Sequence, residues 1–220
     1  HMSAITANKA LFARIAAVWD AREALDLTDE QQRVLMLTHR GFVRGGAALT
    51  GDADKRMQEI KGRLATLGTS FTQNLLADER DWFKPLSEDD LQGLPDFAID
   101  AARAAGVEKG ADGPVVTLSR SIITPFLQFS PRRDLRETAF NAWVARGANG
   151  NETDNCAIAA EILELRHERA QLLGYDSFAD YKLETEMAKT PDAVRGLLMD
   201  VWGPAKSQAE ADADVLTGMM

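Results

Sequence analysis

The residues with the clearest chemical potential are His167 and Glu168, which open the pentapeptide His-Glu-Arg-Ala-Gln that ends at Gln171. A zinc-peptidase helix needs His at both ends of such a pentapeptide, because positions i and i+4 share one face and both imidazoles must reach one metal. Gln171 is a poor zinc donor. We therefore predict that His167 is an ordinary surface histidine, and we expect no catalytic, cofactor-binding or metal-binding residue in this chain.

One further metal scheme depends on the same histidine. A carboxylate-bridged bundle needs Glu-x-x-His on two helices. Glu164 and His167 supply one such motif and nothing supplies the other. The remaining histidines are His39 and His1, and His1-Met2 has the form of a cloning scar.

Cys156 is the single cysteine and lies near the start of a helix that Thr153 or Asp154 is expected to cap. The helix dipole would favour its thiolate, but no His or Lys lies beside it in sequence, so a small packing residue is the preferred interpretation. Gly45 and Gly46 could cradle an anion. Without a strand-to-helix phosphate pattern, they are better interpreted as the end of a helix.

Hydrophobic periodicity and capping signals predict an all-α fold, a bundle-like array of about eight to ten helices. At most one short strand pair is expected, near residues 115–119. The run of branched side chains there favours a strand, but the sequence shows no evident partner strand. Gly203-Pro204 should kink the last helix. The expected helices are 8–25, Thr28 to Gly45, 52–76, a short one after Ser87, 95–105, one restarting at Thr124-Pro125, 131–146, 154–174, one capped by Ser177, and one from Thr190.

Several local expectations follow from these patterns. The first helix should bury one apolar stripe that includes Leu11 and Val18. The run Asp78-Glu-Arg-Asp81 is interpreted as a solvated charge run. Gly106 is interpreted as a helix end, and Ser130-Pro131 as an N-cap followed by the first helical residue.

Composition excludes some classes of function. The chain has 220 residues, 45% of them hydrophobic, and a net charge of −9, as in an ordinary soluble globular protein. An acidic protein lacks the clustered cations that bind nucleic acid. No apolar run approaches the roughly 20 residues that span a bilayer. The single cysteine suits a reducing compartment, and a cytoplasmic location is expected.

An ordered set of segments carries a family resemblance. The segments are His39–Leu49, Leu67–Leu76, Arg133–Arg146, Asn155–Gly174, Tyr175–Leu183 and Met187–Pro191. In this order they resemble the zinc metallopeptidases of the thimet oligopeptidase type, with the peptidyl-dipeptidase branch nearest and oligopeptidase A second. No single segment is diagnostic, but the set runs over nearly the whole chain.

The resemblance implies that the catalytic His-Glu-x-x-His helix and its further Glu ligand lie beyond the region that this chain resembles. Residues 3–220 would then be a helical segment from the N-terminal half of a larger peptidase that binds zinc and releases C-terminal dipeptides from short peptides. The segment itself would be inactive and bind no zinc. Its partners would be the remainder of the peptidase and, through the helix carrying Trp202, a second copy of itself.

A free-standing helical interaction module is the alternative, because composition and periodicity alone do not distinguish it from part of an enzyme.

Overall fold

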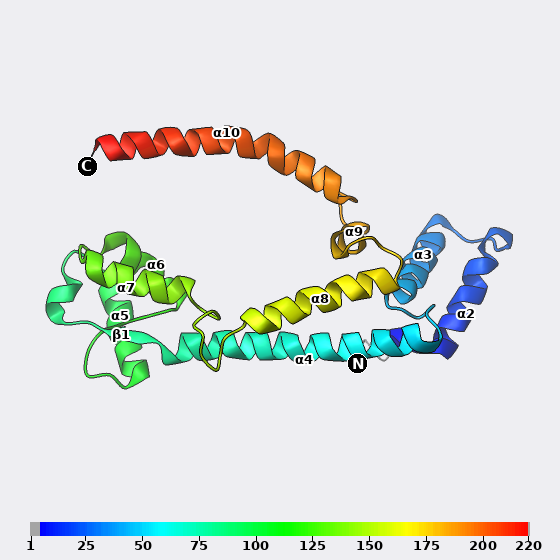
Figure 1. The fold of residues 1–220 in the computed structure, drawn as a ribbon, viewed down its shortest axis with the longest axis horizontal. Helices are drawn as coiled ribbons and strands as arrows, with labels where there is room; N and C mark the ends of the chain where they lie inside the picture. The colour runs from blue at the N-terminus through cyan, green and yellow to red at the C-terminus, as the bar shows by residue number, and fades with distance from the viewer. Residues whose placement is uncertain (1–4, 220) are drawn as a thin grey trace. The chain divides into compact units, whose positions relative to one another are not determined.

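The computed structural model describes residues 5–219, and within that range it is an all-α protein with one two-stranded sheet (Figure 1). The expected fold class is confirmed. The interpretation of His1-Met2 as a cloning scar concerns residues outside those described. The described α-helices are α2 (Lys9–Asp20), α3 (Asp29–Arg44), α4 (Gly51–Asp81), α5 (Asp96–Lys109), α6 (Arg120–Phe129), α7 (Arg133–Val144), α8 (Cys156–Leu172), α9 (Phe178–Leu183) and α10 (Pro191–Gly218).

The chain divides into two compact units. One contains the residues up to Gly62 together with those from Glu164 onwards, and the other is Arg63–Leu163. The first unit holds α2, α3, α9 and α10 and a short 3-10 helix, η1 (Arg22–Ala24). The second unit holds α5 to α7, the sheet and a 3-10 helix, η2 (Glu88–Leu91).

In the first unit, α2 and α3 pack against each other. Thr28 and Gln31 form the expected capping box at the start of α3, with the amide of Gln31 donating to the Thr28 hydroxyl at 3.3 Å and the amide of Thr28 donating to the Gln31 side chain at 2.9 Å. The two helices meet at His39, whose ring stacks on Trp19 at 4.7 Å and on Phe12 at 5.7 Å between centroids. His39 is therefore a packing residue.

The apolar stripe of α2 is less covered than its spacing predicts. No residue of this described helix is buried, and Val18 keeps 45% of its surface exposed. The expectation of a buried stripe is wrong, because the packing of α3 leaves the outer part of the stripe uncovered. The helix end predicted at Gly45 is confirmed: Gly45 is the C-cap of α3 and Gly46 has a φ of 88°.

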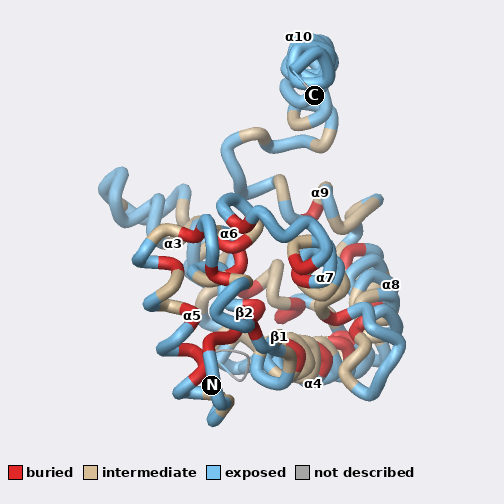
Figure 2. Tube along the Cα trace, turned by 90° about the vertical axis from the view of Figure 1, so that its left-hand side faces the viewer, coloured by how far each residue is buried: buried red, intermediate tan, exposed pale blue. Residues whose placement is uncertain are grey.

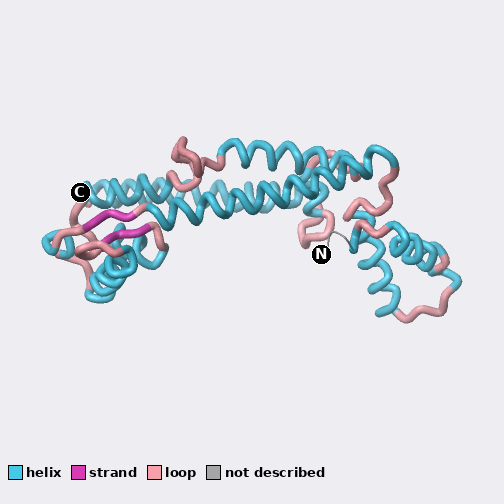
Figure 3. The backbone as a smooth tube through the Cα atoms, turned by 90° about the horizontal axis from the view of Figure 1, so that it is seen from below, coloured by secondary structure: helices cyan, strands magenta, loops and turns pink. Residues whose placement is uncertain are grey.

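In the second unit, the predicted strand and its partner are both present (Figure 3). β2 (Val115–Thr117) pairs antiparallel with β1 (Phe83–Pro85), and Val116 lies opposite Lys84. All three β2 residues are buried, which explains why this strand consists of β-branched and mostly apolar residues. The core around β2 consists of Leu86, Leu91, Leu94, Ala98, Val116, Leu118, Ile123, Phe126, Leu135 and Ala139.

Two proline predictions and one glycine prediction are wrong. Pro125 lies inside α6, so it does not start a helix. The helix begins after its N-cap Ser119 and runs without interruption past Pro125 to Phe129. The next helix, α7, has Arg132 as its N-cap, so Ser130-Pro131 does not start it. Gly106 lies within α5, which ends at the left-handed Gly110. A Cβ at position 106 would lie 2.0 Å from the carbonyl oxygen of Gly113, so the close approach of this loop requires a glycine in the helix.

The last helix is the least covered element of the described residues. Thr190 caps α10 as predicted, accepting the amide of Ala193 at 3.2 Å, and the helix continues through Pro204. None of its described residues is buried, and the tube of α10 is exposed along almost its whole length (Figure 2). In the described residues, no helix is both long and apolar enough to cross a membrane.

Candidate functional site

His167 and Glu168 lie on α8, in surroundings that do not suit a metal. His167 is exposed, as predicted. The carboxylate of Glu168 accepts two hydrogen bonds from the Arg56 guanidinium, at 2.6 and 2.7 Å, and this pairing lowers the pKa of Glu168. The glutamate that would polarise water in a zinc peptidase is here one half of a bidentate ion pair between α4 and α8.

Gln171 closes the turn that follows α8. Its side-chain amide donates to the carbonyl oxygens of Tyr175 and Asp176, at 3.1 and 2.9 Å, so it satisfies two backbone acceptors beyond the helix end. Within residues 5–219, no three His, Cys, Asp or Glu side chains are grouped so that they could hold a metal ion. The side chains present in this part of the chain do not fit a zinc ion.

Cys156 is the first residue of α8 and is exposed, so its interpretation as a packing residue is wrong. Its amide donates to the Asp154 carboxylate at 2.8 Å, and the same carboxylate raises the pKa of the Cys156 thiol through a hydrogen bond and through its charge. A thiol with a raised pKa is a weak nucleophile at neutral pH. The neighbouring carboxylate therefore opposes the effect of the helix dipole.

A cation–aromatic cluster fixes α9 to α3 in the first unit. Arg44 donates to the carbonyl oxygen of Tyr181 at 2.6 Å and to the Tyr175 hydroxyl at 3.2 Å, and it also pairs with the carboxylate of Glu184. Its guanidinium carbon lies 4.2 Å from the centre of the Tyr181 ring. Arg169 donates to the Tyr181 hydroxyl at 2.7 Å. Arg44 is thus brought together with four side chains that lie more than 120 positions later in the sequence.

The charges of this cluster are coupled to one another. The Tyr175 hydroxyl donates to Glu184 at 2.7 Å, and this hydrogen bond, with a smaller contribution from Arg44, lowers the pKa of Glu184. Burial and the same glutamate raise the pKa of Tyr175. The neutral tyrosine and the ionised glutamate are therefore the forms that the fold stabilises.

Asp78 is the polar residue that sequence reasoning placed wrongly. It keeps only 9% of its surface exposed, and its carboxylate accepts hydrogen bonds from the amide of Gly147 at 2.7 Å, the side chain of Asn149 at 2.8 Å and the hydroxyl of Thr153 at 2.5 Å. The run that begins at Asp78 is therefore not fully solvated. The residues next to Asp78 in sequence give no indication that it is buried, because its hydrogen-bond partners lie about 70 residues away.

Asn155 holds the same loop at a second point. Its side chain donates to the carbonyl oxygen of Phe71 at 3.0 Å and accepts from Asn74 at 2.9 Å, and its amide donates to the carbonyl oxygen of Gly147 at 2.7 Å. Asn155 is buried. The loop from Gly147 to Asn155 is thus fixed to α4 by side chains at both of its ends.

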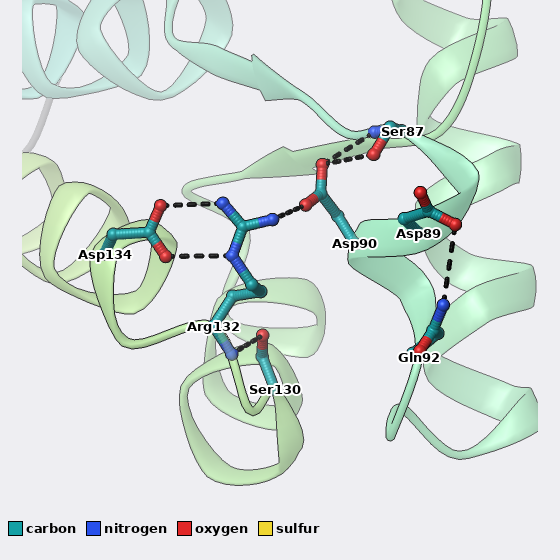
Figure 4. A network of polar contacts seen from close by, with 7 residues as sticks. All are labelled: Ser87, Asp89, Asp90, Gln92, Ser130, Arg132 and Asp134. Carbon is teal, nitrogen blue, oxygen red and sulfur yellow. Dashed lines mark hydrogen bonds and ion pairs between the residues drawn. The ribbon is translucent and has the colours of Figure 1, made fainter.

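Arg132 links the start of α7 to η2 (Figure 4). Its guanidinium makes two hydrogen bonds to Asp134, at 3.0 and 2.8 Å, and a third to Asp90. Asp90 also accepts from the amide and the hydroxyl of Ser87, at 2.9 and 2.7 Å, and these bonds lower its pKa. All three acidic and basic groups are used by the fold, so this network positions α7 and leaves no group free for chemistry.

Among the described residues, each unit has at least one hollow large enough for a ligand. The second unit has a cavity of about 840 Å³ lined by Arg80, Lys109, Arg120 and Arg146 among others. Three of these cations are already engaged: Arg80 with Asp81, Lys109 with the carbonyl oxygen of Arg80, and Arg146 with Glu79. The first unit has an apolar groove of about 690 Å³ between α2 and α3, called the α2–α3 groove below.

The comparisons with known proteins agree with the resemblance seen in the sequence. A family model described as Peptidase family M3 matches residues 126–220. Oligopeptidase A of Haemophilus influenzae is 32% identical over 216 residues, covering 96% of this chain and 32% of the relative. Dipeptidyl carboxypeptidase of Salmonella typhimurium is 34% identical over 205 residues, covering 91% of this chain and 30% of the relative.

This chain is related to the peptidases of family M3. The relationship extends to saccharolysin of Saccharomyces cerevisiae, which is 25% identical over 195 residues. The sequence pointed to a peptidyl-dipeptidase and to oligopeptidase A, and the relatives include proteins named dipeptidyl carboxypeptidase and oligopeptidase A.

The M3-related chain spans about a third of the length of these curated relatives. Within the described part of the chain, Arg44 and Arg132 position helices, and Asp78 fixes a loop to α4. Their role in the M3-related chain is to build the scaffold.

Proposed function

We propose that the chain is a non-catalytic helical part of a zinc-dependent peptidase of family M3 that hydrolyses short peptides. The observation that carries the proposal is the match over nearly the whole chain to peptidases, combined with a sequence that contains no His-Glu-x-x-His pentapeptide. Zinc would be held by the parent enzyme, in the cytoplasm, and residues 3–220 would help to wall the space where peptides are admitted.

A peptide-cleavage assay and metal analysis of the purified chain test the first half of this proposal. We expect no hydrolysis and no stoichiometric zinc, because Glu168 is paired with Arg56 and Gln171 caps a turn. One equivalent of tightly held zinc, or cleavage that a chelator abolishes, would contradict it.

The specificity of the parent enzyme is tested separately. We propose that it releases C-terminal dipeptides, as the name of the Salmonella typhimurium relative suggests. The parent should then cleave a short peptide with a free C-terminus and lose most activity on the same peptide with an amidated C-terminus. Equal rates on both peptides would favour endopeptidase cleavage and leave the assignment to the family intact.

The free-standing interaction module remains the second candidate, because the α2–α3 groove and the uncovered α10 are surfaces that a binding protein would use. Reading the parent gene distinguishes the two: a downstream His-Glu-x-x-His supports the peptidase, and a stop codon directly after Met220 supports the module.

A further inference from the structure

The second unit contains a further cavity, of about 500 Å³, lined by residues of α4, of α7 and of the loop from Gly147 to Asn155. We call it the Asp78 cavity. Its volume suits a small ligand or a single side chain. No lysine, arginine or histidine is among the described residues that line it. Its lining includes Asp78, Asp81, Trp82, Leu118, Asn141 and Asn149.

Asp78 gives this cavity a negative charge that no cation offsets. The residue is only 9% exposed. Its carboxylate accepts hydrogen bonds from neutral donors on Gly147, Asn149 and Thr153. Such donors stabilise the charged form of a carboxylate without cancelling its charge. A cation that enters the cavity is therefore attracted to this residue.

The acids on either side of Asp78 are different, because each has a cation of its own. Glu79 forms an ion pair with Arg146. Both oxygens of Asp81 accept hydrogen bonds from the Arg80 guanidinium. Asp78 forms no ion pair among the described residues, and its partners are the neutral donors alone. Because buried charges in proteins are ordinarily paired, a bound cation is the natural counter-charge for Asp78.

The rest of the lining suits a cation that is carried on an aliphatic stem. Trp82, Leu118, Ala142 and Ala145 form the apolar part of the cavity. Methylene groups of long basic side chains pack on apolar surface of this kind while the charged end stays in polar surroundings. A tryptophan ring also attracts organic cations.

A metal ion fits this lining less well. Ca²⁺ takes about six to eight oxygen ligands, but the oxygens of Asp78 and Asp81 already accept hydrogen bonds. An ammonium or guanidinium group needs only a few acceptors. Asn149 donates its amide group to Asp78 and keeps its side-chain oxygen as an acceptor. The side chain of Asn141 has no hydrogen-bond partner among the described residues.

We propose that the Asp78 cavity binds the side chain of a lysine or arginine residue of a peptide. The aliphatic stem packs on the apolar part of the lining, and the charged group donates to Asn141 and Asn149 near the Asp78 carboxylate. In the parent enzyme the cavity would favour peptides that carry a basic residue, a consequence that rests on the proposed function. The binding itself does not rest on it and is measured on the chain alone.

The test is an NMR titration of the full 220-residue chain. The chain has four tryptophans, and Trp82 is the one that lines the Asp78 cavity, so its indole N–H signal, assigned with Trp82→Phe, reports binding there. Nα-acetyl-lysine amide and Nα-acetyl-arginine amide should shift this signal saturably. Nα-acetyl-norleucine amide has the stem without the charge, and glycinamide has an ammonium without the stem. Each of these should bind about tenfold more weakly or worse.

Asn141 offers a variant that should keep the fold, because its side chain is exposed. Asn141→Lys places a cation at the cavity and should weaken the binding of Nα-acetyl-lysine amide on the order of tenfold, whereas Asn141→Asp should strengthen it by a similar factor. Gln128→Lys is the matched control. It adds the same charge at an exposed position of α6, outside the lining of the cavity, and should bind like the unmodified chain. Circular dichroism should be unchanged in all three variants.

Several outcomes would overturn the proposal. Neither basic amide shifts the Trp82 signal, or norleucine amide or glycinamide binds as tightly as lysine amide. Saturation by Ca²⁺ in place of the basic amides would show a metal site. Unchanged binding in Asn141→Lys, or equal weakening in Gln128→Lys, would show that the cation does not bind in the Asp78 cavity. None of these measurements involves peptide cleavage, so their failure would leave the proposed function intact.

Discussion

The hydroxyl of Thr153 donates a hydrogen bond to the carboxylate of Asp78 at 2.5 Å, across 75 positions of sequence. The same carboxylate holds the amide of Gly147 at 2.7 Å. One acid near the end of a long helix therefore holds the loop from Gly147 to Asn155 at its start and close to its end.

Asp78→Ala should lower the free energy of unfolding by about 3 kcal/mol, because hydrogen bonds to a charged group are worth about 1.5 to 3 kcal/mol each and the buried amide of Gly147 would lose its acceptor. Urea unfolding followed by circular dichroism measures the change. Asp81→Ala is the matched control, since Asp81 pairs on the surface with the adjacent Arg80 and should cost less than about 1 kcal/mol. Equal effects of the two variants would show that Asp78 is not the anchor of the loop.

Gly106→Ala should destabilise the second unit by about 2 kcal/mol or more, because the new methyl group would lie 2.0 Å from the carbonyl oxygen of Gly113. Gly68→Ala on α4 meets nothing within 4 Å and should stabilise the chain by about 0.5 to 1 kcal/mol through helix propensity. Thermal unfolding of both variants checks the prediction. A neutral Gly106→Ala would mean that the loop at Gly113 can move away freely.

Trp143→Phe should change the free energy of unfolding by less than about 1 kcal/mol. The indole nitrogen of Trp143 is buried and, among the described residues, has no hydrogen-bond partner, so the substitution removes an unsatisfied donor. Trp143→Ala should cost about 3 to 5 kcal/mol, since it removes the ring that packs against the core. Denaturant unfolding compares the two, and a large loss in the Phe variant would reveal an acceptor for the indole.

Glu184→Gln should flatten the loss of stability at acid pH. The fold lowers the pKa of Glu184 below its ordinary value of 4.5, so its contribution is present above pH 4.5 and disappears as the pH falls through the lowered value. Urea midpoints at about pH 7 and about pH 3 should therefore differ less in this variant than in the unmodified chain. An equally large reduction of this difference in Glu164→Gln, at an exposed glutamate outside the cluster, would contradict the prediction.

Predictions from the sequence succeeded where the determining contacts are local. The caps at Thr28, Ser177 and Thr190 are set by residues three positions away, and the structure has all three. The continuous helix through Pro125 could not be predicted in this way, because a proline after threonine is also a good helix start.

The positions that sequence reasoning missed depend on distant partners. The burial of Asp78 depends on a loop about 70 residues later, and the role of Gly106 depends on the backbone at Gly113. The Arg44 cluster joins α3 to α9 across more than 130 positions. No periodicity or capping rule reports such contacts, so these residues looked like ordinary surface or helix-end positions.

Because Gln171 caps the turn after α8, we expect that completing the zinc-peptidase motif at this position would not create a zinc site. Gln171→His would complete the letters of a zinc-peptidase signature, and any pattern search would then report a protease. The protein would instead lose the two hydrogen bonds that Gln171 makes to Tyr175 and Asp176, and Glu168 would still be held by Arg56. Isothermal titration with zinc should show no tight site, and unfolding should show a loss of about 1 kcal/mol. The three fixed letters of the motif do not make a site when its glutamate, Glu168, already serves the scaffold.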